Sequence, residues 1–408
     1  MKFKALARAG GTVLALLTGG CVIPIQSDSS DGGGLSEGGE STSSGSSSGS
    51  ASSGATGSGT SSGAGSVNTS SADGGSGSWT DITSNLKNMS SLCGTVMVVA
   101  AKPDEDLLLA GIAGQGVWAS RDGGDSWTMT GTGAGSAQVD NRVSDFVFDP
   151  AHTDQWWFSG TYATDGVFVY STSDDGQTLT SLAKINNNNG DVVSVDFTDP
   201  ARKTLLVGAH ETPQTAYKST DNGMTWENVG TSLPAGLECP SPHILDTNTY
   251  IIGCNKPMGA ILRSINGGTT WNQVSQSGGS FDPLVASDGS IYWPDPDGSM
   301  NRSTDQGVTW TKTVASGMLT SIHPIELPDH RIATLASSRV VLSSDQGSTW
   351  NAVTPQLPAP GSGGDGWFGL TYSTQRKLFV AWTWSCGNGA IPVLANTIMS
   401  YPFDYSKQ

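Results

Sequence analysis

The chain has 408 residues, of which 36% are hydrophobic and 14% are charged, and its net charge at pH 7 is -16. A chain this acidic, without a basic stripe, is a poor partner for nucleic acid or for an anionic membrane surface. No glycine-rich phosphate loop precedes a helix, and no His or Cys pair has metal-ligand spacing, so neither a cofactor nor a metal is expected.

The first 21 residues have the organisation of a secretory signal. Three basic residues precede an apolar stretch over 12–17, which is too short to cross a membrane, and the segment ends at Cys21. It resembles a bacterial lipoprotein signal, although Thr18 stands where that family usually has an aliphatic residue. The resemblance implies an exported protein held at the bacterial cell envelope, in the outer membrane or at the cell surface, by a lipid on Cys21. An ordinary signal peptide with an incidental cysteine is the alternative.

The next segment has the composition of a linker. Residues 27–78 are almost entirely Ser, Gly, Ala, Thr and Asp, with no Lys or Arg. Such a stretch cannot bury a core and is expected to be disordered. The chain is therefore divided into a signal over 1–21, a disordered tether over 22–78 and a folded domain over 79–408.

A short pattern, S-x-D-x-G-x-[ST]-W, occurs six times in the folded domain. The copies begin at Ser120, Thr172, Ser219, Ser264, Ser303 and Ser343. They follow one another at intervals of roughly 40 to 50 residues, which is typical of a propeller or repeat array. The acid can bond the backbone of a tight turn, and the Gly supplies a positive φ. The acid positions are Asp122, Asp174, Asp221, Asn266, Asp305 and Asp345, with Asn as the one replacement.

Each copy follows a hairpin of two apolar strands, and a seventh hairpin over 368–382 has only one further strand, over 396–403. The missing fourth strand is available at the start of the domain, because Ser78–Ile82 is similar to the segment that follows each repeat, such as Thr225–Val229. Dividing 79–408 among seven blades gives about 47 residues per blade, which matches the spacing of the repeats. The prediction is an all-β, seven-bladed β-propeller closed by its N-terminal strand, with six blades as the alternative.

The repeat resembles the Asp-box, or BNR, repeat of sialidase-like propellers, sortilin-type receptors and xyloglucanases, over roughly residues 79–408. The resemblance implies that the six boxes are structural and lie at the outer blade edge. It does not extend to two features of those enzymes. The arginine-rich N-terminal motif of sialidases is absent, and Gly111–Gly116 carries no acid where xyloglucanases would place their first one. Xyloglucanases also pair two propellers, whereas this chain has one.

Four cysteines remain in the domain, and an even number in an exported chain predicts disulfides. Cys239 and Cys254 flank neighbouring strands of one hairpin. Cys93 opens the first blade and Cys386 follows a strand of the last, and these two blades touch if the ring closes. The expected bridges are Cys239–Cys254 and Cys93–Cys386.

Ligands of propellers bind over the central channel, on the face where each inner strand begins and each second strand ends. Trp and acidic residues gather there, a combination that suits sugar binding because indole stacks on a sugar ring and carboxylates bind its hydroxyls. Packing between blades and turn formation are the alternatives for several of them. The candidate ligand residues are His210, Glu211, Asp282, Trp293, Asp295, Asp297, Asp365, Trp367 and Trp384.

These observations lead to a monomeric, lipid-anchored surface propeller that binds a carbohydrate or a surface protein without catalysis. The alternative is a glycoside hydrolase acting on an extracellular polysaccharide with acids on the same face. A second alternative is an assembly factor, since a single-propeller photosystem assembly family resembles this repeat array. That family has a basic ligand face, which this chain lacks. A fold alone does not choose among these functions.

Overall fold

A computed structural model describes residues 65–70, 77–87, 89, 95–163, 166, 168–185, 190–257, 259–279, 281–360, 366–384 and 397–407. The described residues all belong to one compact unit, Ser61–Gln408, which is the second of the two into which the chain divides. Within the described residues, no helix is long and apolar enough to cross a membrane. Cys21, Cys93, Asp365 and Cys386 lie outside the described residues.

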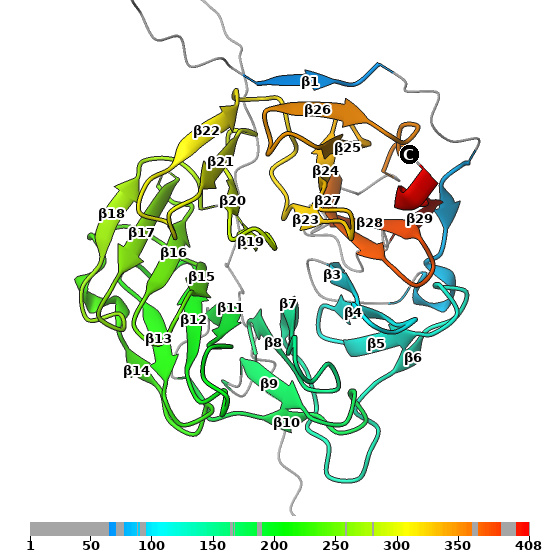
Figure 1. Ribbon diagram of the computed structural model, residues 1–408. Coiled ribbons are helices and arrows are strands. Elements are labelled where there is room, and N and C mark those ends of the chain that lie inside the picture. The colour runs from blue at the N-terminus through cyan, green and yellow to red at the C-terminus, as the bar shows by residue number, and fades with distance from the viewer. Residues whose placement is uncertain are drawn as a thin grey trace, which may run out of the picture. The chain divides into compact units, whose positions relative to one another are not determined.

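Seven antiparallel sheets are arranged around a common centre in the second unit (Figure 1). The first three blades, each read from the centre outward, are β3 (Val96–Ala101), β4 (Leu108–Ile112), β5 (Gly116–Ser120), β6 (Thr128–Met129); β7 (Arg142–Phe148), β8 (Trp156–Thr161), β9 (Val169–Thr172), β10 (Thr180–Ser181); and β11 (Gly190–Val195), β12 (Leu205–Ala209), β13 (Ala216–Ser219), β14 (Glu227–Asn228). The next two are β15 (Ser241–Ile244), β16 (Tyr250–Cys254), β17 (Ala260–Ser264), β18 (Asn272–Ser275); and β19 (Leu284–Val285), β20 (Ile291–Pro294), β21 (Met300–Ser303), β22 (Thr311–Val314).

The last two blades borrow strands from the start of the unit. They are β23 (Ile325–Glu326), β24 (Ile332–Ala336), β25 (Arg339–Ser343), β26 (Thr349–Ala352) with β1 (Ser66–Asn68); and β27 (Gly366–Ser373), β28 (Leu378–Trp384), β29 (Ile398–Pro402) with β2 (Thr80–Asp81). Three short 3-10 turns are the helical elements of the described part: η1 (Ser84–Leu86), η2 (Gly230–Ser232) and η3 (Tyr405–Lys407). The all-β, seven-bladed fold is confirmed, and the six-bladed alternative is wrong.

The ring closes as the sequence predicts. Strand β2 pairs antiparallel with β29, with Thr80 opposite Ser400. The Trp79 ring lies 5.3 Å from the ring of Tyr401, and its indole N–H donates to the carbonyl of Pro355 at 3.0 Å. The N-terminal strand thereby covers the outer edge of the last blade, an edge that an open array would leave unpaired.

Strand β1 was not predicted. It lies within the stretch expected to be disordered, yet it pairs in parallel with β26, with Val67 opposite Trp350. Val67 also packs against the apolar cluster between blades five and six. One apolar residue in a Ser/Gly-rich stretch gave no periodic signal, so this strand depends on the edge that β26 offers.

The six repeat turns share one hydrogen-bond pattern, seen clearly in the third copy. The Ser219 hydroxyl accepts from the Gly223 N–H at 2.8 Å, and Asp221 Oδ1 accepts from the Thr225 N–H at 2.9 Å. In the fourth copy, Asn266 accepts in the same way from the Thr270 N–H at 2.9 Å. These turns connect the third and fourth strands of each blade, so they lie at the outer part of the ring.

The tryptophans of the repeats connect neighbouring blades. Three indole N–H groups donate to carbonyls of the preceding blade or its closing segment, namely Trp127 to Ile82, Trp226 to Ala183 and Trp271 to Val229. The indoles of Trp310 and Trp350 instead bond to the glycine of their own turn. The repeat therefore both forms a turn and fixes the packing of one blade on the next.

Candidate active site in the central hollow

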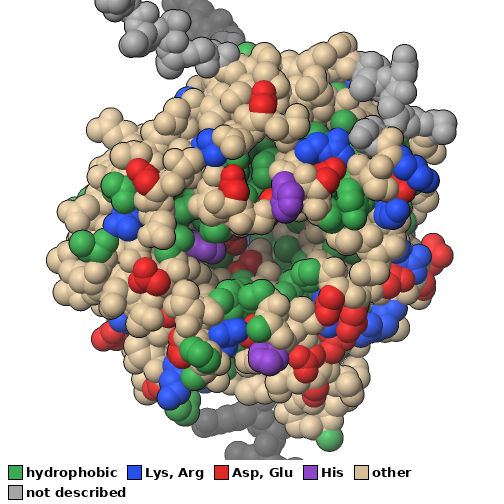
Figure 2. All heavy atoms as spheres, viewed as in Figure 1, with side chains coloured by type: hydrophobic (Ala, Val, Ile, Leu, Met, Phe, Trp, Pro, Cys, Tyr) green, Lys and Arg blue, Asp and Glu red, His purple; other side chains and the backbone are tan. Residues whose placement is uncertain are grey.

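The inner strands define what we call the entry face, the face on which they begin. Their first residues are Val96, Arg142, Gly190, Ser241, Leu284, Ile325 and Gly366. Figure 2 shows one face of the ring with a hollow at its centre, where histidine, acidic and apolar side chains are visible.

His210 is the centre of a polar chain between blades two and three. It follows the last residue of β12, and its Nδ1 lies 3.0 Å from Asp191 Oδ2, on β11. Its Nε2 lies 3.1 Å from the hydroxyl of Tyr162, and the guanidinium of Arg142 stacks on that ring at 4.2 Å. Asp191 Oδ1 also accepts from the Ser144 hydroxyl at 2.8 Å.

The pKa of His210 reflects its acidic neighbour. Burial alone would lower it, but the charge of Asp191 and the hydrogen bond to it more than compensate, so the pKa of His210 is raised. The raised pKa favours the protonated form of the imidazole beside this carboxyl. The His210 ring is therefore held with Nε2 directed at Tyr162.

Asp282 is the least satisfied carboxyl in the hollow. It precedes β19 in blade five and is half-buried, but its Oδ1 is enclosed and has no hydrogen-bond partner among the described residues. Burial, together with the charges of Asp145 and Asp191, raises the pKa of Asp282 well above its ordinary value. A raised pKa favours the protonated form of this carboxyl, which is the form that can donate a proton.

Asp145, on β7, is different because both of its oxygens are occupied. Oδ1 accepts from the N–H and the hydroxyl of Ser159, at 3.0 and 2.7 Å, and Oδ2 accepts from the Val193 N–H at 3.2 Å. Burial raises the pKa of Asp145 against the opposing effect of these hydrogen bonds. Because Val193 belongs to the next blade, Asp145 connects blades two and three and fixes the surroundings of Asp191.

Two half-buried histidines, His243 and His323, also have shifted pKa values. Burial and the proximity of His323 lower the pKa of His243, on β15, to about 4. Burial also lowers the pKa of His323, although its Nδ1 lies 2.9 Å from the carbonyl of Asp282. Both imidazoles are therefore neutral at pH 7. Among the described residues, no group of three or more His, Cys, Asp or Glu side chains is arranged to hold a metal ion.

The structure assigns clear contacts to several predicted site residues. Trp293 is fully buried and Trp367 nearly so, which indicates packing inside the blades. Asp295 Oδ2 accepts from the Gly278 N–H at 2.6 Å. Asp297 accepts from Ser299, Ser316 and Lys312, and these bonds outweigh burial and lower its pKa to about 2. No observation tests a ligand role for these four residues.

Two other predicted residues lie at the hollow's mouth. Glu211 follows His210, has a φ of 57°, and its N–H donates to Glu238 Oε2 at 2.9 Å. Trp384 ends β28 and is half-buried. The sequence reasoning missed Asp145, Asp191 and Tyr162. A charged residue within an apolar inner strand, such as Asp145 in RVSDFVF, was the available signal.

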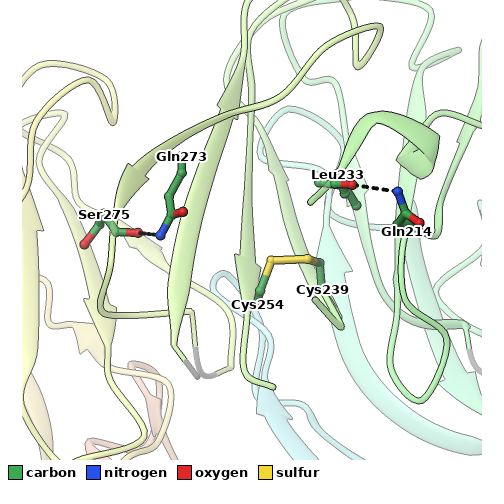
Figure 3. The surroundings of a disulfide bond; sticks show 6 residues. All are labelled: Gln214, Leu233, Cys239, Cys254, Gln273 and Ser275. Carbon is green, nitrogen blue, oxygen red and sulfur yellow. Dashed lines mark hydrogen bonds between the residues drawn. A yellow bond between two sulfur atoms is a disulfide. The ribbon is translucent and has the colours of Figure 1, made fainter. Parts of the chain in front are cut away.

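The predicted Cys239–Cys254 disulfide is present and joins the segments on either side of β15 and β16 (Figure 3). Close to it, the Gln214 side-chain amide donates to the Leu233 carbonyl at 2.9 Å. The second expected bridge, Cys93–Cys386, lies outside the described residues.

A separate cavity of about 360 Å³ lies on the opposite face, between blades five and six. Ser287, Glu326 and His330 line it, and both Ser287 and Glu326 contact His330 Nδ1, at 2.8 and 3.1 Å. Since both contacts use one ring nitrogen, the three residues do not form a nucleophile–base–orienter relay.

No family model matches the chain. A curated xyloglucanase from a Paenibacillus species is 26% identical over 228 residues, an alignment that covers 45% of this chain and 21% of that protein. The chain thus spans about a fifth of the length of this relative.

Solved structures with a similar fold have low sequence identity. The GH74 xyloglucanase from Xanthomonas campestris aligns with a TM-score of 0.51 and 16% identity, over 80% of this chain and 56% of that one. YCF48 bound to D1 peptide aligns with a TM-score of 0.53 and 12% identity, over 82% and 97%. At these identities the likeness concerns the propeller fold, which both enzymes and binding proteins share.

Proposed function

We propose that this chain is a glycoside hydrolase that acts on an extracellular polysaccharide at the entry face of its propeller. This proposal replaces the expected non-catalytic binder, which is contradicted by the sequence similarity to a curated xyloglucanase. The assembly-factor alternative has only a common fold in its favour, at 12% identity. The observation that carries the proposal is the half-buried carboxyl of Asp282, whose pKa is raised well above its ordinary value by burial and by the charges of Asp145 and Asp191.

Glycoside hydrolysis requires one protonated and one ionised carboxyl on either side of the scissile bond. Asp282 is the proton donor: it gives its proton to the glycosidic oxygen as the bond to the anomeric carbon breaks. Asp191 supplies the second carboxylate, as the nucleophile or as the base toward a water molecule. Its hydrogen bonds from Ser144 and His210 fix the carboxylate in one orientation.

The surrounding groups have supporting roles in this scheme. Asp145 positions Asp191 through the connection between blades two and three. Tyr162 contacts the far side of His210, and Arg142 stacks on the Tyr162 ring. The Asp-box turns, by resemblance to other propellers of that kind, serve only the fold.

The test is release of reducing ends from xyloglucan and from other neutral glucans. Asp282→Asn and Asp191→Asn should each lower kcat at least about 100-fold, the usual contribution of a positioned acid or base. Asp288→Asn is the matched control, since Asp288 lies in the turn between β19 and β20 and asparagine can still accept from Ser290. Equal activity in all four proteins would contradict the assignment.

The same proposal has the protein working outside the cytoplasm as a monomer, tethered through the residues that precede β1 to a lipid on Cys21. The Cys239–Cys254 bridge supports an oxidising compartment. Replacing Cys21 with Ser should move the protein from the membrane fraction to the soluble fraction. A wild-type protein that is already soluble would refute the anchor without affecting the hydrolase proposal.

A further inference from the structure

Three half-buried aromatic side chains form a continuous row at the mouth of the hollow. Phe281 comes from the loop before β19, Phe368 from β27 and Trp384 from the end of β28. The Phe281 and Phe368 rings meet edge to face at 5.3 Å, and the Phe368 and Trp384 rings stack at 5.7 Å with an interplanar angle of 26°. The row spans from blade five to blade seven, past the two-residue inner strand β23 of blade six.

The backbone fixes this row. Phe281 has a φ of 54°, which is uncommon for a bulky residue, and its carbonyl accepts from the Trp293 indole at 2.9 Å. Phe368 stands at an irregularity of the β27–β28 ladder, between Trp367 and Gly369. The positive φ of Phe281 and the bulge at Phe368 bring the two rings together. Apolar packing alone requires neither of these backbone features.

A carboxyl adjoins the row. Asp282 follows Phe281 directly in the sequence, and its side chain is half-buried, with Oδ1 enclosed. A ligand that suits both features must present a flat apolar face to the rings and hydroxyl donors to the acid. A pyranose ring has this combination, because its C–H groups lie on one face and its hydroxyls around the edge.

The charges of the hollow select among such rings. Asp145, Asp191 and Asp282 lie near enough to one another to interact electrostatically, and the whole chain carries a net charge of -16. A polyuronate or a sulfated glycan is a polyanion, so its approach to a chain of this net charge is electrostatically disfavoured. The ring must therefore be uncharged.

We propose that Phe281, Phe368 and Trp384 form a stacking subsite for an uncharged pyranose next to Asp282. The inference rests on the proposed hydrolase activity in one respect, namely that the sugar bound at this subsite is the sugar that reacts with Asp282. The subsite gives this chain a specificity for neutral glycans over polyuronates.

The test is affinity electrophoresis of the purified chain in native gels that contain xyloglucan, hydroxyethylcellulose or polygalacturonate. The wild-type protein should be retarded by a neutral glycan and not by polygalacturonate. Trp384→Leu should weaken the binding about tenfold or more, the loss expected for one stacked ring. Trp384→Tyr should retain most of the binding because it keeps an aromatic face.

The matched control is Trp226→Leu, which also removes one indole. The second repeat already has Leu179 at the corresponding position, so this change is compatible with the fold. Melting temperatures identify any variant that fails to fold, and Phe281→Leu then replaces Trp384→Leu as the test. The subsite is refuted if the control and Trp384→Leu bind alike, if polygalacturonate retards the protein equally, or if no neutral glycan retards the wild-type protein.

Binding and hydrolysis are measured separately, so the two proposals can fail independently. Retardation that depends on Trp384, without release of reducing ends, would support the subsite and refute the hydrolase. Hydrolysis with the same KM in the wild type and in Trp384→Leu would support the hydrolase and refute the subsite.

Discussion

His210 Nδ1 lies 3.0 Å from Asp191 Oδ2, and this contact joins the second strand of blade three to the inner strand of the same blade at the mouth of the hollow. The side chains of both residues are largely buried, with exposed fractions of 17% and 21%. A charged pair at this depth is screened little by salt. It therefore both stabilises the fold and orients Asp191.

The stability contributed by this pair should depend on pH. Because Asp191 raises the pKa of His210 above its ordinary value of 6.5, the contribution is complete below that value and is lost as the pH rises through the folded-state pKa. His210→Gln should therefore lower the free energy of unfolding by about 1 kcal/mol at pH 6, and by less at pH 9. Urea denaturation at both pH values measures the difference. The exposed His152, changed to Gln, is the control, and a loss for His210→Gln that is independent of pH would contradict the pairing.

The disulfide should control the position of His210. The N–H of Ala209 donates to the Cys239 carbonyl at 3.1 Å, and the N–H of Glu211 donates to Glu238. Ala209 and Glu211, which flank His210, therefore both donate hydrogen bonds to residues 238–239. The disulfide joins this segment to Cys254. Reducing the disulfide, or changing both cysteines to Ser, removes a cross-link between two residues with a sequence separation of 15. The free energy of unfolding should then fall by about 3 kcal/mol.

The specific readout for this prediction is the NMR titration of the His210 ring. Its pKa should fall toward 6.5 when the bridge is absent, because the ring is then less firmly held against Asp191. An unchanged His210 titration in the reduced protein would show that the bridge stabilises the fold without positioning this residue.

The repeat turns should be purely structural. Asp221→Ala removes the acceptor for both the N–H and the hydroxyl of Thr225, and the melting temperature should fall by a few degrees. Asp221→Asn should retain most of the stability, since Asn266 makes the equivalent bonds in the fourth repeat. Activity per folded molecule should be unchanged in both variants, and a loss of activity at full folding would place function at the outer edge.

Ring closure should depend on Trp79. Trp79→Ala removes the contact with Tyr401 and the hydrogen bond to Pro355, and should reduce the free energy of unfolding by about 2 kcal/mol or more. The backbone amides of β29 should then exchange faster, because β2 no longer pairs with the outer edge of that strand. Protection of β29 equal to that in the wild type would mean that β2 does not close the ring.

The blade number, the closing strand and one disulfide could be predicted because each depends on local sequence. The turn chemistry recurs at regular intervals, and Trp79 stands in a segment similar to the one that follows each repeat. Cys239 and Cys254 flank adjacent strands of one hairpin. In each case the relevant residues are either close in sequence or marked by a repeated pattern.

The candidate site could be predicted only in part, because it forms between blades. His210 and Asp282 were found from their place at strand ends. Asp191 and Tyr162 carry no local signal, since their importance arises when blades two and three bring them to the same imidazole. The indole bonds of Trp226 and Trp271 to the preceding blade were missed for the same reason.

The most direct test of the account is the pH dependence of xyloglucan hydrolysis by the wild-type chain, measured as reducing-end release with Asp282→Asn alongside. The account predicts activity that falls as the pH rises and Asp282 loses its proton, because the pKa of that carboxyl is raised. It predicts the loss of this alkaline limb, together with most of kcat, in Asp282→Asn. Hydrolysis that persists unchanged in Asp282→Asn, or the absence of hydrolysis of any neutral glucan by the wild type, would contradict it.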